Sequence, residues 1–425
     1  MTNGPNKHSE ARNNHSEAAN MNGAEMTTVE AAPTMSDDQL DGMLVQRARD
    51  LAEVLRSRAA DAVANRRLPA ETVADLKASG LLKVLQARRN GGYERPMRTH
   101  LEVIAALAEG CASTSWVVGV THAHSWMMSH FPEAAQRHTY GTDPDTFISA
   151  VIAPRGRAER VEGGYRLSGT WPFASGSENS QYLFLGAAVF DGGQEVDQGE
   201  FLVPTRAATF KDDWHVTGLA GTGSCSVVLT DVEVPEAHYL SMAALMTGDS
   251  PGAPLHDGWQ HRAAATPVLI LALAGSALGI ARRALADFPA VIGDKVIAYT
   301  ANKQVEHVTT HLHVADAAAK VDQAGFHLGR CAEDIDSHAR AGTSPSPVNR
   351  ARMRHDCAVA VRLCLEAVEL LWRDTGGSGL YTTNPLGRGL ADLQAMNVHG
   401  GLMVDTAAEL YGRMLVGLEP NTPLL

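Results

Sequence analysis

The sequence predicts an α+β protein made of three consecutive parts: helices, then strands, then helices. Apolar residues recur at helical spacing over residues 37–145 and again over residues 241–425. Between them, residues 146–240 consist of short alternating or β-branched runs separated by Gly-rich turns. Strands grouped in one block, instead of alternating with helices, are typical of the α+β class. We therefore expect three domains with these boundaries.

Composition and charge exclude several function classes. A net charge of −12 without a dense Lys/Arg block argues against nucleic acid and anionic membranes as partners. The five Cys form no CxxC pair, which predicts a reducing, cytoplasmic location. The longest apolar run, 263–280, contains Thr266, Pro267 and Ser276 and predicts a buried helix, not a membrane span. Residues 1–36 lack the apolar core of a signal peptide, and we expect a disordered tail there.

The helical parts carry clear start and stop signals. Ser36 and two Asp residues predict a cap for a helix over 39–65, and Gly80 predicts the end of a second helix over 71–79. Further helices are expected over 100–111, 115–128 and from Pro132 to Ala135. In the last part, Pro-containing breaks at 344–347 and 384–385 separate long helices.

The β part is expected to hold short strands joined by tight turns. The turns are predicted at Gly163-Gly164 and at Asp191-Gly192-Gly193. The expected strands are 147–152, 158–161, 165–168, 182–189, 200–203, 210–214 and 226–234.

The stretch Gly-Thr-Trp-Pro-Phe-Ala-Ser-Gly, residues 169–176, stands between two of these strands. An extended backbone would place Trp171 and Phe173 on one face, and Pro172 fits a sheet edge or a bulge. That face suits the edge of a planar ring system, with Ser175 supplying a hydroxyl and a backbone N–H. The alternative is that the aromatic side chains fill a core beside a turn.

Nucleotide and metal motifs are not found. The Gly-rich segment 218–223 has no helix after it, and the chain contains neither a Walker pattern nor a Gly-x-Ser-x-Gly elbow. The closely spaced His residues in 122–124 and 307–313 have no acidic or Cys partner at a recognisable spacing. We therefore expect packed or solvated His there and no metal site.

Four segments together resemble a known family. They are Ala-Ser-Thr-Ser-Trp-Val at 112–117, the 168–176 stretch, segment 214–224 with 232–235, and the Gly-rich 376–381 with 384–388 and His399. In this order they resemble the flavin-dependent monooxygenases of the acyl-CoA dehydrogenase fold, such as the 4-hydroxyphenylacetate- and phenol-type hydroxylases. The resemblance implies an N-terminal helical domain, a central β-barrel or sandwich domain and a C-terminal four-helix bundle.

Two departures from the family pattern stand out. Ala391 occupies the place of the second Arg in the family's Arg-x-x-Arg-Asp motif, which puts one intersubunit or cofactor contact in doubt. The segment Leu410-Tyr411-Gly412-Arg413 lacks the Glu that acyl-CoA dehydrogenases usually carry after this Tyr. That absence argues against a dehydrogenase.

The resemblance implies the oxygenase half of a two-component system. Such a protein takes reduced FMN or FAD from a separate flavin reductase, and a flavin hydroperoxide formed with O₂ transfers one oxygen atom. The expected substrate is an aromatic or polyketide-like small molecule, and the expected assembly is a homotetramer. The alternatives are oxygenation of nitrogen or sulfur, an acyl-CoA dehydrogenase, and a scaffold protein without activity.

The resemblance also assigns residues. It gives catalytic roles to His124, Ser149 and His399, with His122 as a rival to His124 on another face of the same helix. The residues implied to bind the flavin are Trp116, Trp171, Phe173, Ser175, Arg262, Gly377 and Arg388.

Overall fold

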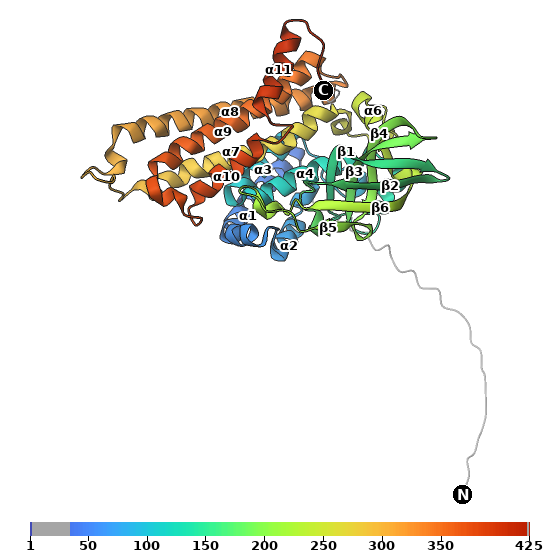
Figure 1. Ribbon diagram of the computed structural model, residues 1–425, viewed down its shortest axis with the longest axis horizontal. Coiled ribbons are helices and arrows are strands. Elements are labelled where there is room, and N and C mark those ends of the chain that lie inside the picture. The colour runs from blue at the N-terminus through green and yellow to red at the C-terminus, as the bar shows by residue number, and fades with distance from the viewer. Residues whose placement is uncertain (2–34, 423–424) are drawn as a thin grey trace, which may run out of the picture.

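A computed structural model describes residues 1, 35–422 and 425 of the chain. The expected tail, residues 1–36, lies outside the described residues except for Met1, Met35 and Ser36. The described chain has a helical part, a β sheet beside it and a long helical bundle (Figure 1). The predicted order of helices, strands and helices is confirmed.

The first helical part contains five α-helices. At the start of α1, the Ser36 hydroxyl accepts a hydrogen bond from the Gln39 backbone while the Gln39 side chain accepts one from the Ser36 backbone. This capping box confirms the predicted helix start. Gly80, with φ of 72°, ends α2 in the left-handed conformation that glycine adopts without strain. The helices are α1 (Asp37–Asn65), α2 (Ala70–Ser79), α3 (Met97–Gly110), α4 (Ala112–Met128) and α5 (Glu133–Tyr140).

The β part is one seven-stranded sheet of order β5-β6-β2-β1-β3-β4-β7. Its strands are β1 (Ile148–Val161), β2 (Gly164–Trp171), β3 (Tyr182–Asp191), β4 (Gln194–Pro204), β5 (Thr209–Lys211), β6 (Ser226–Pro235) and β7 (Tyr239–Ser241). β1 and β3 are parallel, and the other neighbours are antiparallel. The two strands predicted over 147–152 and 158–161 are one strand, because β1 continues through an irregularity between Val151 and Gly156.

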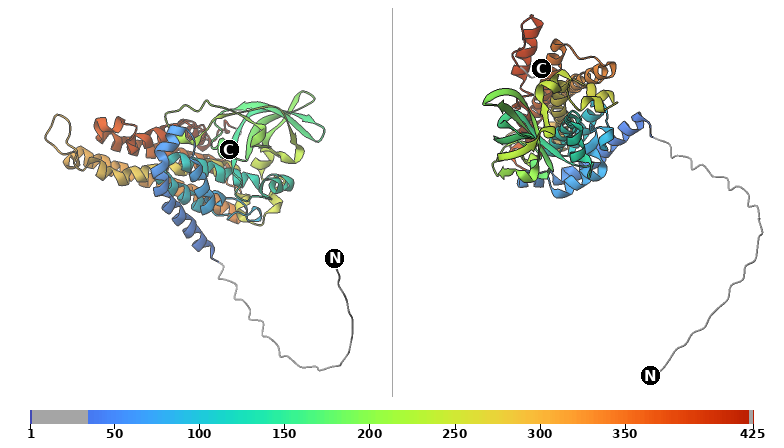
Figure 2. Two further views of the ribbon diagram at one scale, coloured as in Figure 1. Left: turned by 90° about the horizontal axis from the view of Figure 1, so that it is seen from below. Right: turned by 90° about the vertical axis from the view of Figure 1, so that its right-hand side faces the viewer.

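The sheet curls around a core of its own. The Tyr165 ring on β2 contacts the Phe201 ring on β4 at 5.1 Å between centroids, although β1 and β3 lie between these strands. The opposite face packs on the helices through side chains such as Ile148, Phe184 and Leu202. Consequently the sheet lies along one side of the helices in both views of Figure 2.

The C-terminal part is a bundle in which α7, α8, α9 and α10 pack together. Its helices are α6 (Met242–Thr247), α7 (Ala265–Ile292), α8 (Val308–Ala341), α9 (Pro347–Asp374), α10 (Pro385–Asn397) and α11 (Val404–Leu415). Pro347 and Pro385 occupy the first turns of their helices, where proline costs no hydrogen bond. α11 projects from the bundle (Figure 1).

α7 contains most of the apolar run that the sequence predicts to be a buried helix. Of the described helices it alone is long and apolar enough to cross a membrane, and 67% of its most apolar stretch is buried inside the fold. It packs against α3, α4, α8 and α9, as a core helix does. The strands span residues 148–241, close to the predicted β segment, and the exact domain boundaries stay a prediction.

Candidate active site

Four of the residues assigned by resemblance meet between α4, the sheet and the end of α10. The Trp116 indole N–H donates to the Ser175 hydroxyl at 3.2 Å, and the Trp116 ring meets the His399 ring edge-on at 5.5 Å between centroids. The Ser149 hydroxyl on β1 donates to the Ser175 carbonyl at 2.8 Å. We call the surface that Trp116, Ser175 and His399 form together the crevice.

His124 stands on α4 and reaches the same strand as Ser149. Its Nδ1 lies 2.9 Å from the Ile148 carbonyl, which can only accept, so Nδ1 carries the proton and Nε2 is a hydrogen-bond acceptor. Burial lowers the pKa of His124 to about 4. The imidazole is therefore neutral at physiological pH.

His122 points into the helical core instead. Its Nε2 donates to the Leu81 carbonyl, and its Nδ1 lies 2.9 Å from Nδ1 of His100. Both ring nitrogens are thus used, and burial lowers its pKa to about 4 as well. Of the two rivals, only His124 keeps a ring nitrogen without a hydrogen-bond partner among the described residues.

His399 follows the end of α10 and is exposed beside Trp116. Its Nδ1 accepts a hydrogen bond from the Gly401 backbone at 3.2 Å, so the ring proton sits on Nε2. Desolvation by the surrounding protein lowers the pKa of His399. The two imidazoles therefore differ in function, because His124 offers an acceptor and His399 offers a donor.

The 169–176 stretch differs from the expectation in two respects. Trp171 is fully buried in the sheet core, where its indole N–H donates to the Gly186 carbonyl at 2.7 Å, so it offers no surface to a ligand. Phe173 has φ of 69° and a side chain that is 68% exposed, so the two rings do not share a face. The cause is that β2 continues to Trp171 and the backbone turns only afterwards.

Ser175 has fewer hydrogen-bonding groups available for a ligand than the sequence predicts. Its backbone N–H donates to the Phe173 carbonyl at 3.0 Å. Only the hydroxyl therefore remains for a ligand in the crevice.

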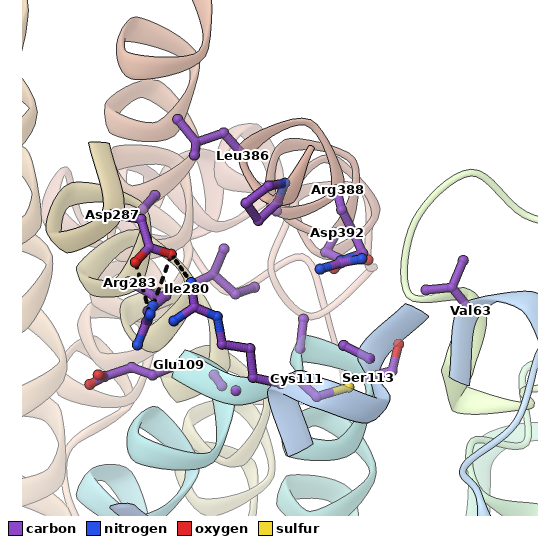
Figure 3. A pocket seen from close by; sticks show the side chains of 18 residues that line it. Val63, Glu109, Cys111, Ser113, Ile280, Arg283, Asp287, Leu386, Arg388 and Asp392 are labelled. Atoms are coloured by element: carbon purple, nitrogen blue, oxygen red, sulfur yellow. Dashed lines mark hydrogen bonds and ion pairs between the residues drawn. The ribbon is translucent and has the colours of Figure 1, made fainter. Parts of the chain in front are cut away.

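Arg388 lies in a pocket between α1, the start of α4, α7 and α10 (Figure 3). Arg388 and Asp392 line it from α10, and Cys111 and Ser113 line it from the start of α4. Ser113 is three residues before Trp116, so the pocket lies beside the crevice along one face of α4.

Arg262 and Gly377 are not brought to the crevice within one chain. Arg262 is exposed near Gly342, at the end of α8. Gly377 stands in the turn after α9, next to Gly376, which lies near Lys295. Among the described residues, neither has a hydrogen bond, ion pair or ring contact with Trp116, Ser175 or His399.

Two hydroxyl residues of the site were not singled out from the sequence. The Ser175 hydroxyl lies 2.8 Å from the Ser224 hydroxyl, which lies 2.7 Å from that of Thr222. Both residues belong to the segment 214–224 that carried the resemblance. Only the folded turn at Gly221 and Gly223 shows which of its hydroxyls face Ser175.

The comparisons with known proteins first define the class. Residues 39–143 match the family described as acyl-CoA dehydrogenase, N-terminal domain, and residues 271–403 match acyl-CoA dehydrogenase, C-terminal domain. The predicted acyl-CoA dehydrogenase-like fold is confirmed.

Individual relatives define the family within that class. The chain is 34% identical to the oxygenase component of the FADH(2)-dependent resorcinol hydroxylase of Rhizobium sp. (strain MTP-10005), over 93% of this chain and 99% of the relative. It is 30% identical to the flavin-dependent monooxygenase oxygenase subunit HsaA of Mycobacterium tuberculosis, over 92% of this chain and 100% of HsaA. The chain therefore belongs to the family of flavin-dependent monooxygenases, as an oxygenase component.

Solved structures agree with this placement. The structure of XiaF from Streptomyces sp. in complex with FADH2 and glycerol matches with a TM-score of 0.85 and 31% identity, over 92% of this chain and 98% of XiaF. The HsaA structure from M. tuberculosis matches with a TM-score of 0.85 and 29% identity, over 91% of this chain and 100% of HsaA. The protein is thus an enzyme that uses reduced flavin and O₂, and a separate reductase supplies the flavin. We therefore reject the two alternatives of an acyl-CoA dehydrogenase and of a scaffold protein without activity.

The residues at the crevice fit a flavin. The exposed ring of His399 beside Trp116 offers a flat surface, and Ser175 is partly accessible. A cofactor with a planar ring and polar edge atoms can use both kinds of contact.

Proposed function

We propose that this enzyme hydroxylates a small aromatic or polyketide-like molecule at the crevice between α4, the sheet and the end of α10. The observation that carries the proposal is the contact of Trp116, Ser175 and His399, joined through β1 to His124. Reduced FMN or FAD would supply the chemistry that delivers one oxygen atom from O₂. Trp116, Phe173 and Ser175 would hold its ring system.

The two imidazoles support a phenolic substrate. A neutral His124 with Nε2 as acceptor can take the proton of a phenol hydroxyl, which raises the electron density of the ring. His399, with its proton on Nε2, can donate a hydrogen bond to an oxygen at the crevice. Ser149 would position Ser175 and lie near the substrate. The relative named for resorcinol acts on such a phenol.

The test measures oxygen transfer with the intact protein. With a flavin reductase, NADH, FMN or FAD and a panel of phenols, we expect a hydroxylated product that carries ¹⁸O from ¹⁸O₂. Without flavin and reductase we expect none. Photoreduced flavin should replace the reductase, because the reductase serves only to supply reduced flavin. Label derived from water, or failure to bind flavin in either redox state, would contradict the proposal.

The variant His124→Ala distinguishes the hypothesis of carbon hydroxylation from that of nitrogen or sulfur oxygenation. Loss of the proton acceptor should lower the yield of a hydroxylated phenol by about 10²-fold, with reduced flavin still bound. An amine or sulfide needs no phenolate, so a loss of less than twofold would favour those substrates. His138→Ala, which changes an exposed histidine on α5, is the matched control.

We further propose a cytoplasmic homotetramer that assembles through the bundle. Large apolar side chains are exposed on α8, among them Val308, Leu312 and Phe326. Among the described residues, a Cβ added at Gly377 would meet nothing within 4 Å, and Gly377 would reach the flavin tail of a neighbouring subunit. Arg388 would serve the tail from the pocket beside the crevice, and Arg262 remains a candidate for flavin contact.

A further inference from the structure

A short chain of hydroxyl groups runs from the crevice into the protein. It begins at Ser175 and passes through Ser224 and Thr222 at oxygen–oxygen distances of 2.8 Å and 2.7 Å. It ends at the Leu219 carbonyl, 2.8 Å from the Thr222 hydroxyl. Thr222 and Ser224 are buried, whereas Ser175 is partly accessible.

The carbonyl at the inner end fixes the direction of every hydrogen bond in this chain. A carbonyl only accepts, so the Thr222 hydroxyl must donate its single proton to Leu219. Thr222 then has only lone pairs for Ser224, so Ser224 donates to Thr222. By the same step, Ser175 donates to Ser224.

The outer end of the chain is thereby left without a free proton. The Ser175 hydroxyl proton is committed to Ser224, and one of its lone pairs receives the Trp116 indole N–H at 3.2 Å. What Ser175 can still offer the crevice is its second lone pair. Its backbone N–H is not available either, because it donates to Phe173.

The inner end is held firmly in place. Leu219 adopts φ of 54°, which is unusual for a residue with a branched side chain, and its N–H donates to the Asp392 carboxylate of α10 at 2.6 Å. The Thr222 carbonyl also accepts the Gly176 N–H at 2.8 Å, which ties the two loops together. Reversing the direction of the hydroxyl chain would break the hydrogen bond from the Thr222 hydroxyl to the Leu219 carbonyl.

We propose that Thr222 and Ser224 are positioning residues that set the Ser175 hydroxyl as a pure hydrogen-bond acceptor and so make the site select reduced over oxidised flavin. The proposal rests on the proposed function. A reduced isoalloxazine carries an N–H at N5, which can donate to this lone pair. An oxidised one has a bare nitrogen there, and two acceptors facing each other repel. The discrimination would thus be built into a chain of three hydroxyls.

The test compares dissociation constants for oxidised and photoreduced flavin under anaerobic conditions. In Ser224→Ala the Ser175 proton loses its acceptor and becomes free to donate into the crevice. We expect the ratio of the oxidised to the reduced dissociation constant to fall about tenfold, the worth of one neutral hydrogen bond. The midpoint potential of the bound flavin should fall by about 30 mV, the two-electron equivalent of that ratio.

A second set of variants distinguishes hydrogen-bond direction from damage to the loop. Thr222→Val keeps the shape of Thr222 but lets Ser224 turn its proton toward Ser175, so the ratio should again fall. Thr222→Ser restores the acceptor and should restore the ratio. Ser180→Ala removes a buried hydroxyl that bonds Ser177 outside this chain, and it should leave the ratio unchanged.

The outcomes are separable. If Ser224→Ala and Thr222→Val bind both flavins with the wild-type ratio and potential, the inference is wrong even though the enzyme is a flavin monooxygenase. If the wild-type protein binds neither flavin, the proposed function fails first. A ratio that falls in Thr222→Val and is not restored in Thr222→Ser would also overturn the inference, since it would indicate loop damage.

Discussion

Asp392 is a buried carboxylate that links α10 to the loop beside the crevice. It accepts the Leu219 N–H at 2.6 Å, and burial raises its pKa from the ordinary 3.8 to about 6, against the opposing effects of Leu219 and Arg388. The native protein therefore binds the Asp392 proton more tightly than the unfolded chain does. The contribution of Asp392 to the free energy of unfolding is therefore largest at low pH. It is lost as the pH rises from about 4 to about 6.

Asp392→Asn tests this carboxylate. Asparagine keeps an oxygen for the Leu219 N–H but has no proton to lose. The free energy of unfolding of the variant, relative to wild type, should increase by about 2 kcal/mol between pH 4 and pH 6.5 and then stay nearly constant. Urea denaturation across this range measures the difference. Burial also raises the pKa of Asp336 to about 6. Because Asp336 is present in both proteins, its contribution cancels in the difference between them. A difference that does not vary with pH would contradict the assignment.

The crevice depends on how closely α3, α4 and α7 pack. A Cβ placed at Gly279 of α7 would overlap the Ala105 carbonyl oxygen of α3, and one at Gly119 of α4 would meet the Ala272 carbonyl oxygen of α7 at 2.5 Å. Ser115 of α4 and Ser276 of α7 share a buried hydrogen bond at the same crossing. These contacts fix the position of α4, and with it Trp116 and His124.

Gly279→Ala should push α7 away from α3. Overpacking against a backbone carbonyl, which cannot move aside, should lower the free energy of unfolding by about 1–3 kcal/mol and weaken flavin binding. Gly412→Ala is the matched control, because a Cβ there meets nothing within 4 Å. Alanine in the interior of α11 should raise stability by up to about 1 kcal/mol. Equal effects of the two substitutions in thermal or chemical unfolding would count against the packing argument.

The molecule as a whole leaves apolar side chains exposed on α8 and at the end of α11. Phe326 is 76% exposed on α8, and further apolar side chains are exposed at the end of α11. Exposed apolar patches of this kind mark contact surfaces between proteins. The bundle is therefore the part of the molecule on which assembly is proposed to depend.

Phe326→Asp places a charge on this surface. If copies of the chain meet there, the variant should have a smaller mass than wild type in light scattering coupled to size exclusion, because a buried, unpaired charge costs several kcal/mol. Gln194→Asp adds the same charge at an exposed position of β4, outside the bundle, and it should preserve the wild-type mass. An unchanged mass in Phe326→Asp would exclude α8 at this point from any interface.

The sequence by itself determined the order of the helical and β parts, several helix ends and which family motifs follow one another. Those signals are local: the Ser36 cap, Gly80 at the end of α2 and the prolines that open α9 and α10 act within a few residues. Only the tertiary structure decided which side chains face the crevice. Trp171 entered the sheet core, His122 and His124 separated to different partners, and Thr222 and Ser224 joined Ser175. The reason is that sequence periodicity shows which residues share one face of a helix or strand. Which residues pack against that face depends on contacts between segments far apart in the chain.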